Sequence, residues 1–521
     1  RTDMARRPSR REFFSMATAA GLGALLASAL ARAQTPSYAI YPDIATRRLK
    51  IRAPKGVDIV EDQAAFGIAP ATYDVLVRQE SNGDYVAYDR NGNVICKNSS
   101  TACIQEALNY KGPGSTVFIA PDSYVLSSQV SVPPHTRIVG AGWNSTVLRE
   151  SPSRTDATPL IYIPDAYFVS IENLRIEGNA PRQPDNTNYI AGADLIYATR
   201  TSQTDPVTDI VYSDSMFLLR NVIVAKARGH GVFLYNLLEP ILDTVRSYSN
   251  AGNGFRIISA DTKVVNCVAG NNGNSGFAIY RNTVITASKS FGSGFVRKSS
   301  PNLNVDGTWA EFFITGPNVV LSGVEAGEGR YSCYTIYNTR NVVIFGSCYD
   351  AGLGNYFING TDSPGPAIQI DSAQNVFARI IAGDFIREAW GLPKITISMT
   401  VVMSNPALPP NNLDVTVLNY SNNDSILINS NVPKGLRLNL TTLSRSVTKN
   451  SGVYVASGDG ITKRFVINHG LYGTPRTAIV TKGSTLPDFK VSVDDTNIYV
   501  DFVSAPPSGT NNIVLYWYAE I

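Results

Sequence analysis

"GHGVFLY", residues 229–235, is the first of a series of similar segments in the middle of the chain. "GNGFRII" (252–258), "NSGFAIY" (274–280) and "GSGFVRK" (292–298) follow it, and the glycines at their third positions are 23, 22 and 18 residues apart. Short β-branched runs connect them, with Gly, Asn and Ser at the turns. A repeat built only from short strands and turns is typical of a solenoid with one coil per unit. The sequence therefore predicts an all-β fold, a right-handed parallel β-helix.

The residues after the aligned glycines are expected to alternate between two environments. Side chains of a strand point to opposite faces in turn, so Phe255, Phe277 and Phe295 are expected to stack inside the coils. Rings and cations about 4.8 Å apart along the outward face would suit a sugar chain, an acidic one included. The alternative is that these outward side chains only cover the sheet beneath a loop. The candidate substrate-binding residues of this face are Phe233, Tyr235, Arg256, Tyr280, Lys298 and Tyr337.

A short helix and two strands are expected before the repeat. "TACIQEALNY" (101–110) has apolar residues on one side and would cap the open end of the solenoid. "STVFIAPDSYVL" (115–126) and "TRIVGAGWNSTVL" (136–148) follow it. This order resembles the opening of the pectate-lyase superfamily, and the resemblance covers about residues 100–390. It implies the β-helix fold and leaves the reaction open, because that fold carries lyases, hydrolases, epimerases, phage tailspikes and adhesins.

The two ends of the chain differ from the repeat. "SRREFF" (9–14), an apolar run and "ARA" (31–33) predict a twin-arginine signal peptide over residues 1–33, with a Sec signal or an anchor as the alternative. We expect a secreted, periplasmic or cell-surface protein with an N-terminal extension at 34–95 and the β-helix at 96–445. Residues 446–521 alternate apolar and polar side chains between turns, which predicts a β-sandwich module for binding or homo-oligomer assembly.

Composition narrows the partners and the cofactors. Without residues 1–33 the chain carries 39 basic and 40 acidic side chains, which excludes a nucleic-acid partner, and no membrane partner is expected after signal cleavage. Cys96 and Cys103 can close a small loop, and Cys333 and Cys348 can pair within a coil, which leaves Cys267 over. Three histidines are too few for a His-rich metal site.

The histidine of the quoted segment has two interpretations. His230 occupies the position that Asn253, Ser275 and Ser293 occupy in later segments, so it can be a polar side chain that hydrogen-bonds at a corner of the coil. "GHG" also resembles a motif of polygalacturonase-type glycoside hydrolases, in which the histidine belongs to the active site. In the family's order, "RTDATPLIYI" (154–163), "GADLIY" (192–197) and "NGFRIIS" (253–259) resemble further motifs of these enzymes.

The resemblance implies roles for the matching residues. Asp194 and Asp156 would supply the general acid and base, which inverting hydrolysis places about 6.5–9.5 Å apart, and Arg256 would bind the substrate. Asp194 is then expected to face an external groove. Two positions depart from the family pattern, since Ala193 replaces the first Asp of a pair and Ile258 replaces a Lys.

Two expected insertions add further candidates. Segment 204–214 contributes Asp209 and Asp214 as alternative catalytic acids. Segment 304–313 contributes Trp309 and Glu311 as substrate contacts. Such loops form the walls of clefts on solenoids, although an isolated loop acid is more often only solvated.

These observations predict an exported polysaccharide-active enzyme, a glycoside hydrolase that uses paired carboxylates in a groove and needs no cofactor. A polysaccharide lyase is one alternative, and it would use Ca²⁺ held by carboxylates and a basic side chain. A carbohydrate-binding adhesin or tailspike-like protein without catalysis is the other.

Overall fold

The computed structural model describes most of the chain after residue 72. The described ranges are 73–181, 189–209, 211, 215–294, 310–353, 365–389, 396–420, 425–433, 436–444, 449–469, 471 and 474–520, together with three N-terminal strands. Those strands belong to a separate unit, Arg1–Thr72. They form an antiparallel sheet of β1 (Ala39–Asp43), β2 (Arg48–Ala53) and β3 (Gly56–Asp58). The predicted signal peptide, residues 1–33, lies outside the described residues.

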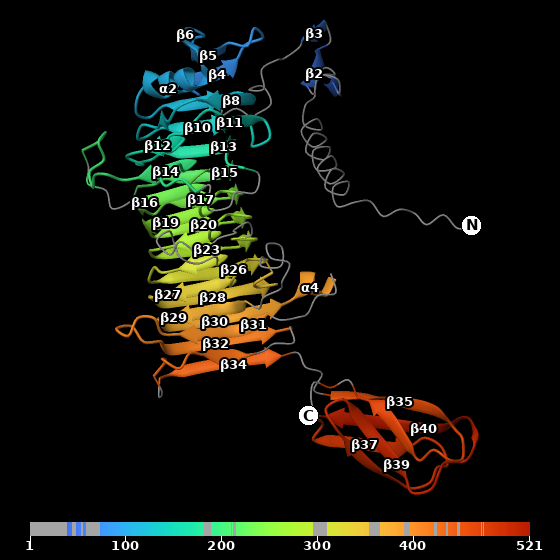
Figure 1. Ribbon diagram of the computed structural model, residues 1–521. Helices are drawn as coiled ribbons and strands as arrows, with labels where there is room; N and C mark the ends of the chain where they lie inside the picture. The colour runs from blue at the N-terminus through green and yellow to red at the C-terminus, as the bar shows by residue number, and fades with distance from the viewer. Residues whose placement is uncertain are drawn as a thin grey trace, which may run out of the picture. The chain divides into compact units, whose positions relative to one another are not determined.

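The central region is a parallel β-helix whose coils stack one on another (Figure 1). Each coil contributes to two sheets, which we name the shorter and the longer sheet. The described strands of the shorter sheet, in order, are β9 (Val130–Ser131), β12 (Ile161–Ile163), β14 (Ile196–Thr199), β16 (Val232–Leu238), β19 (Phe255–Ala260), β22 (Phe277–Ile279), β25 (Phe312–Ile314), β27 (Tyr334–Tyr337), β29 (Pro366–Asp371), β31 (Ile397–Val402) and β33 (Ile426–Ile428).

The longer sheet bends midway along its strands. The strand segments before and after the bend therefore lie on two different faces of the β-helix. Asn173 and Asn221 occupy the bend in successive coils with φ of 58° and 53°, a left-handed conformation that Asn adopts more readily than most residues. Asn221 Nδ2 donates to Asn173 Oδ1 at 2.7 Å, which links the two bends. The described strands of this sheet are β4 (Val75–Gln79), β5 (Tyr85–Asp89), β6 (Val94–Asn98), β7 (Thr116–Ile119), β8 (Asp122–Leu126), β10 (Arg137–Gly140), β11 (Thr146–Glu150), β13 (Ser170–Glu177), β15 (Leu218–Ala225), β17 (Ile241–Asp243), β18 (Arg246–Tyr248), β20 (Thr262–Val265), β21 (Val268–Gly270), β23 (Thr283–Thr286), β24 (Lys289–Phe291), β26 (Val319–Gly327), β28 (Arg340–Tyr349), β30 (Gln374–Gly383), β32 (Asn411–Asn419) and β34 (Leu438–Ser444).

An aromatic stack fills the inside of the coils beneath the shorter sheet. Phe255, Phe277, Phe312 and Tyr334 are fully buried, and their ring centroids are 4.6, 5.0 and 5.5 Å apart. The inward positions expected for Phe255 and Phe277 are confirmed. Phe277 pairs with Phe312 on β25, and the third expected member of the stack, Phe295, lies outside the described residues. Among the described strands, β25 follows β22 in this sheet. Similar residues at a similar sequence spacing do not show which strands pair in neighbouring coils when an insertion lengthens one coil.

A helix and two disulfides complete the β-helix as the sequence predicts. Helix α2 (Ser100–Tyr110) lies at the N-terminal end of the stack and buries Ile104, Ala107 and Leu108 (Figure 1). Disulfides join Cys96 to Cys103 and Cys333 to Cys348, with Cα atoms 5.2 and 5.7 Å apart, and Cys267 is a buried free cysteine. A second short helix is α4 (Phe385–Ala389). Among the described residues, helices are too short or too polar to cross a bilayer.

The C-terminal residues form the predicted antiparallel β-sandwich. One sheet consists of β35 (Lys449–Gly458), β40 (Gly509–Glu520) and β37 (Thr477–Lys482), and the other of β36 (Arg464–Asn468), β39 (Asn497–Phe502) and β38 (Phe489–Val493). Alternate side chains of both sheets form one core that includes Ile467, Ile498, Val500, Ile513 and Leu515.

Candidate functional site

Aromatic side chains line the outward face of the shorter sheet in successive coils. Tyr162 on β12 pairs with Tyr197 on β14, which pairs with Phe233 on β16. Because the strands are parallel and in register, the three rings stack with centroids 5.7 and 4.8 Å apart. Tyr235, two residues further along β16, contacts Phe233 at 6.1 Å between centroids.

Arg256 continues this row on β19, where it pairs with Phe233. Its guanidinium carbon lies 4.6 Å from the centroid of Phe233 and 5.6 Å from that of Tyr280, so the cation lies against two rings. The row then runs through Phe313 and Tyr337, each step 6.2 Å between centroids. We call the whole set the ring column: Tyr162, Tyr197, Phe233, Arg256, Tyr280, Phe313 and Tyr337.

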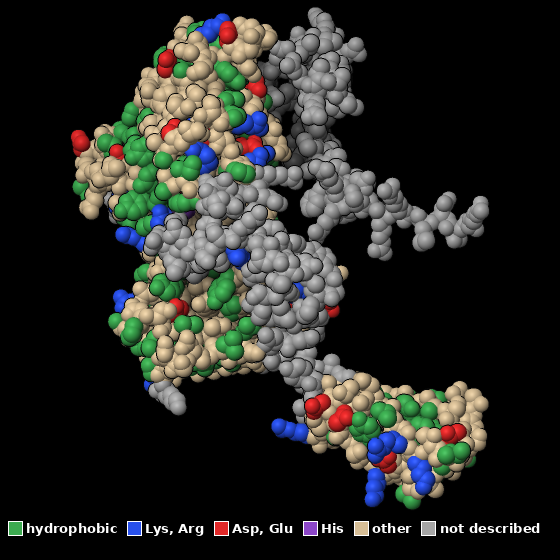
Figure 2. All heavy atoms as spheres, in the orientation of Figure 1, with side chains coloured by type: hydrophobic (Ala, Val, Ile, Leu, Met, Phe, Trp, Pro, Cys, Tyr) green, Lys and Arg blue, Asp and Glu red, His purple; other side chains and the backbone are tan. Residues whose placement is uncertain are grey.

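The ring column is open in parts and covered in others. Tyr235 and Tyr337 are exposed, whereas Phe313 is buried against Ala278 and Ala310 in a small cluster apart from the main core. Figure 2 shows hydrophobic side chains gathered at the level of β14 and β16, with Lys or Arg side chains beside them. Partial burial also raises the pKa of Tyr197. The part of the ring column that is open to solvent is therefore the region next to Tyr235.

Polar side chains form a second row at the corner before the shorter sheet, which we call the turn column: Asp194, His230, Asn253 and Ser275. The backbone N–H of His230 donates to Asp194 Oδ1 at 2.7 Å. The N–H of Asn253 donates to His230 Nδ1, and that of Ser275 to Asn253 Oδ1, both at 2.9 Å. The side chains of Asp194, His230 and Asn253 therefore each accept a hydrogen bond from the backbone of the next coil.

The turn column confirms one of the two interpretations of His230, that of a corner residue equivalent to Asn253 and Ser275. The fourth expected member, Ser293, was wrong, because its backbone N–H donates to Glu311 and β25 is the strand that pairs with β22. His230 Nε2 lies 3.2 Å from the Tyr189 hydroxyl. Burial, with the charge of Arg256, holds the pKa of His230 well below its usual value, so the ring is neutral.

Asp194 lies inside the corner and not in the external groove where we expected it. Its side chain accepts from His230, and the residue is only 3% exposed. Burial raises the pKa of Asp194 to about 7, against the opposing influence of the His230 N–H and the charge of Arg256. Asp194 thus combines a raised pKa with a position near enough to Arg256 to feel the charge of that cation. Its catalytic role stays a prediction.

Asp156, the second expected acid, belongs to a turn held by ion pairs. Its Oδ1 lies 2.7 Å from Arg154 Nη2 and also accepts from the hydroxyl of Thr158 at 2.8 Å. Partial burial by itself raises the pKa of Asp156. The hydrogen bonds from Thr158 and Arg154 outweigh it, so the pKa lies below its ordinary value. The Arg154 guanidinium also pairs with the buried Glu150. These contacts give Asp156 a role in the turn.

The insertion candidates lie in three different situations. Asp209 is described and has a left-handed φ of 57°. Asp214, Lys298 and Trp309 lie outside the described residues. Glu311 was expected to contact substrate, but its carboxylate is fully buried inside the coil and does not reach the outward face.

Glu311 accepts three hydrogen bonds, from Ser290 in β24 and from Ser293 just after that strand. Ser290 Oγ donates at 2.5 Å, Ser293 N at 2.7 Å and Ser293 Oγ at 2.6 Å. Burial raises the pKa of Glu311 to about 7 despite these bonds. Within the described residues, groups of three or more His, Cys, Asp or Glu side chains that could hold a metal ion are not found.

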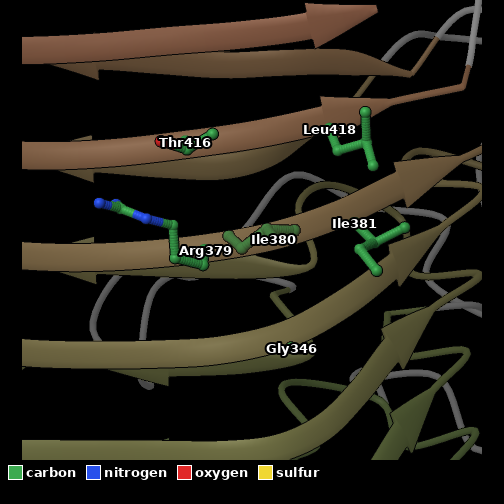
Figure 3. A pocket seen from close by; sticks show the side chains of 6 residues that line it. All are labelled: Gly346, Arg379, Ile380, Ile381, Thr416 and Leu418. Atoms are coloured by element: carbon green, nitrogen blue, oxygen red, sulfur yellow. The ribbon is translucent and has the colours of Figure 1, made fainter. Parts of the chain in front are cut away.

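A hollow of about 370 Å³ lies on the longer sheet, away from the ring column (Figure 3). Arg379, Ile381, Thr416 and Leu418 line it from β30 and β32. The Arg379 guanidinium stacks on Phe377 at 4.1 Å and pairs with Asp414 at 3.0 Å, so its charge is already matched. This hollow offers mainly apolar contact.

Sequence reasoning missed three members of the ring column, Tyr162, Tyr197 and Phe313. A signal for two of them was present, because "LIY" occurs at both 160–162 and 195–197 and places the two tyrosines at equivalent positions. Phe313 had no comparable signal, because the undescribed residues 295–309 separate it from the preceding coil.

Comparison with solved structures identifies the same architecture elsewhere. Full-length tailspike protein 2 of an Escherichia coli O157:H7 bacteriophage aligns with a TM-score of 0.51 and 16% identity, over 86% of this chain and 65% of that chain. The enzymatically active domain of bacteriophage CBA120 tailspike protein 2 aligns with the same TM-score and 15% identity, over 86% and 73%. The fold is a parallel β-helix. At such identities the likeness shows this fold alone, and the chain spans just under two thirds of the full-length tailspike.

A pectate lyase, Pel9A, aligns with a TM-score of 0.34 and 14% identity, over 53% of this chain and 70% of that chain, which is too low to support an argument. No model of a known protein family and no curated protein sequence matches the chain.

Proposed function

We propose that the protein binds an extended polysaccharide along the ring column and acts on it there. The observation that carries the proposal is the alignment of Tyr162, Tyr197 and Phe233 with Arg256 on one outward face. The C–H faces of sugar rings pack on aromatic rings, whose faces are electron-rich. A glycan that crosses the coils meets a new side chain about every 4.8 Å, the spacing of strands in a sheet.

The proposed substrate is an acidic glycan that is hydrolysed near Arg256. The guanidinium against Phe233 and Tyr280 supplies a positive charge for a sugar carboxylate. Asp194, with a pKa of about 7, is the proposed general acid: its proton would pass to the leaving glycosidic oxygen, and the water that attacks the anomeric carbon would release a proton to solvent. The resemblance of the motifs around Asp194, His230 and Arg256 to polygalacturonase-type hydrolases supports this assignment. Export through the twin-arginine pathway is part of the proposal and rests on residues 9–14.

Glycan binding without cleavage is the second candidate, and one observation favours it. Asp194 and His230 both accept backbone hydrogen bonds from the next coil, as Asn253 does. Their presence in the turn column therefore has a structural reason that needs no chemistry.

The test compares an exposed ring that contacts the column with an equally exposed ring elsewhere. Tyr235 is 45% exposed beside the column, and Phe345, on the longer sheet, is 44% exposed. Tyr235→Ala should weaken retention by immobilised acidic polysaccharides roughly threefold to tenfold, since an aromatic contact contributes about 0.5–1.5 kcal/mol. Phe345→Ala is the control and should leave retention unchanged.

The same polysaccharides distinguish the reactions. New reducing ends without unsaturated products indicate hydrolysis, ultraviolet-absorbing unsaturated ends indicate a lyase, and retention with neither supports binding alone. Equal losses in both variants, or no retention by any acidic or neutral polysaccharide, would remove the ring column as the binding site.

A further inference from the structure

The two outward faces of the C-terminal sandwich differ in chemistry. The sheet β36–β39–β38 has a polar outward face. Arg464 Nε and Nη2 pair with Asp501 at 2.6 and 2.9 Å, and the guanidinium lies 5.3 Å from the centroid of Tyr499. The Tyr499 hydroxyl donates to Asp494 at 2.6 Å. Charges, hydrogen bonds and aromatic surface are matched within this face, as in a surface that stays in water.

The sheet β35–β40–β37 has an apolar outward face. Val453 and Val455 on β35 are 57% and 50% exposed, Tyr516 on β40 is 50% and Ile479 on β37 is 52%. Val453 pairs with Tyr516, and Ile479 pairs with Tyr518, so these side chains are neighbours across the three strands. We call this set the apolar outer face: Val453, Val455, Ile479, Val514, Tyr516 and Tyr518. A contiguous patch of this kind marks an interaction surface, whereas single exposed apolar residues do not.

We propose that the apolar outer face binds the same face of a second copy of this chain. The described outward positions around it, Ser451, Thr477, Thr481 and Asn512, are uncharged, so two copies can approach without like-charge repulsion. A carboxylate, Glu520, stands only at one end of β40. The same patch on both partners satisfies two-fold symmetry, and two sheet faces stack about 10 Å apart. This proposal does not rest on the proposed polysaccharide function.

The size of the face sets the expected strength. Three strands about 4.8 Å apart, with β35 10 residues and β40 12 residues long, present roughly 500 Å² per copy. A total of about 1,000 Å² lies at the low end of specific interfaces. The association should therefore be weak and should increase with protein concentration.

The experiment measures the mass of the full chain by sedimentation velocity from about 1 to 200 μM, a range that covers micromolar dissociation constants. Val453→Lys places a charge in the apolar outer face. Val466→Lys is the matched control, because Val466 is a 43% exposed valine in a strand of the opposite, polar face. The wild-type mass should rise toward that of a dimer, Val453→Lys should weaken this association at least tenfold, and Val466→Lys should leave it unchanged.

Ile479→Lys, on the other edge strand, is a second variant in case Val453→Lys does not fold, and circular dichroism checks each protein. A wild-type chain that stays monomeric over the whole range overturns the proposal. So does an equal loss in Val466→Lys. If Val453→Lys loses polysaccharide retention while the mass is monomeric in all proteins, the face binds glycan and self-association is wrong.

Discussion

The turn column and the ring column belong to the same coils, yet they perform different tasks. A turn-column residue precedes a ring-column residue by three positions in each of three coils: Asp194 and Tyr197, His230 and Phe233, Asn253 and Arg256. The turn side chains are buried and accept backbone hydrogen bonds from the next coil. The ring side chains point outward and contact one another.

The difference between the two columns indicates which positions of a coil can serve a function. Asp, His and Asn perform the same structural task in the turn column, because each offers one acceptor atom at the corner. A functional motif at such a position is therefore hard to separate from a structural one. The ring column consists of side chains that stack on one another along the outward face, so it is the part of each coil that a ligand can meet.

The largest expected effect tests whether the turn column is only structural. If Asp194 is the general acid, Asp194→Asn should lower kcat by a factor of about 10² to 10⁴, because an amide cannot donate the proton. The amide oxygen can still accept from the His230 N–H, so thermal unfolding should change little. Steady-state assays on the polysaccharide that yields reducing ends measure kcat. His230→Asn is the control and should cost less, since Asn253 already occupies that column. Unchanged kcat in Asp194→Asn would contradict its role as the general acid and leave the turn column structural, whereas a wild-type protein that retains the glycan and releases no product would favour binding alone.

The next effect separates inward from outward rings. Phe277 is fully buried between Phe255 and Phe312, so Phe277→Ala should lower the free energy of unfolding by about 3–5 kcal/mol. Tyr235→Ala, on the outward face, should lower it far less while it weakens glycan retention. Urea unfolding of both variants measures the difference. Similar losses of stability would mean that the outward rings are part of the core.

The smallest effect concerns the buried carboxyl of Glu311 and its dependence on pH. The pKa of Glu311 is about 7 in the folded protein, above its ordinary 4.5, so folding is favoured when this group is protonated. Its contribution is fully present below about pH 4.5 and is lost as the pH rises through about 7. The free energy of unfolding of the wild type should therefore fall between about pH 4.5 and 7. Glu311→Gln should make this fall smaller by up to roughly 3 kcal/mol.

Urea unfolding at about pH 5 and pH 8 tests this expectation. Asp194 shifts in the same direction and remains in the variant, so some dependence on pH should persist. An identical dependence in Glu311→Gln and the wild type would contradict the burial of a protonated Glu311.

The sequence alone was enough to predict the kind of coil and the helix that caps it, and it offered the cross-links as possibilities. Alternation and a period of 22 to 23 residues are local properties, so they predict the β-helix and the inward positions of Phe255 and Phe277. Short separations likewise made the pairs Cys96–Cys103 and Cys333–Cys348 possible, and the structure contains both. Only the tertiary structure decided which residues become neighbours across an insertion. It paired Phe277 with Phe312, and it buried Asp194 in the corner. The register of parallel strands is set by hydrogen bonding and packing between whole coils. Loops of any length can separate, along the sequence, the residues that these contacts bring together.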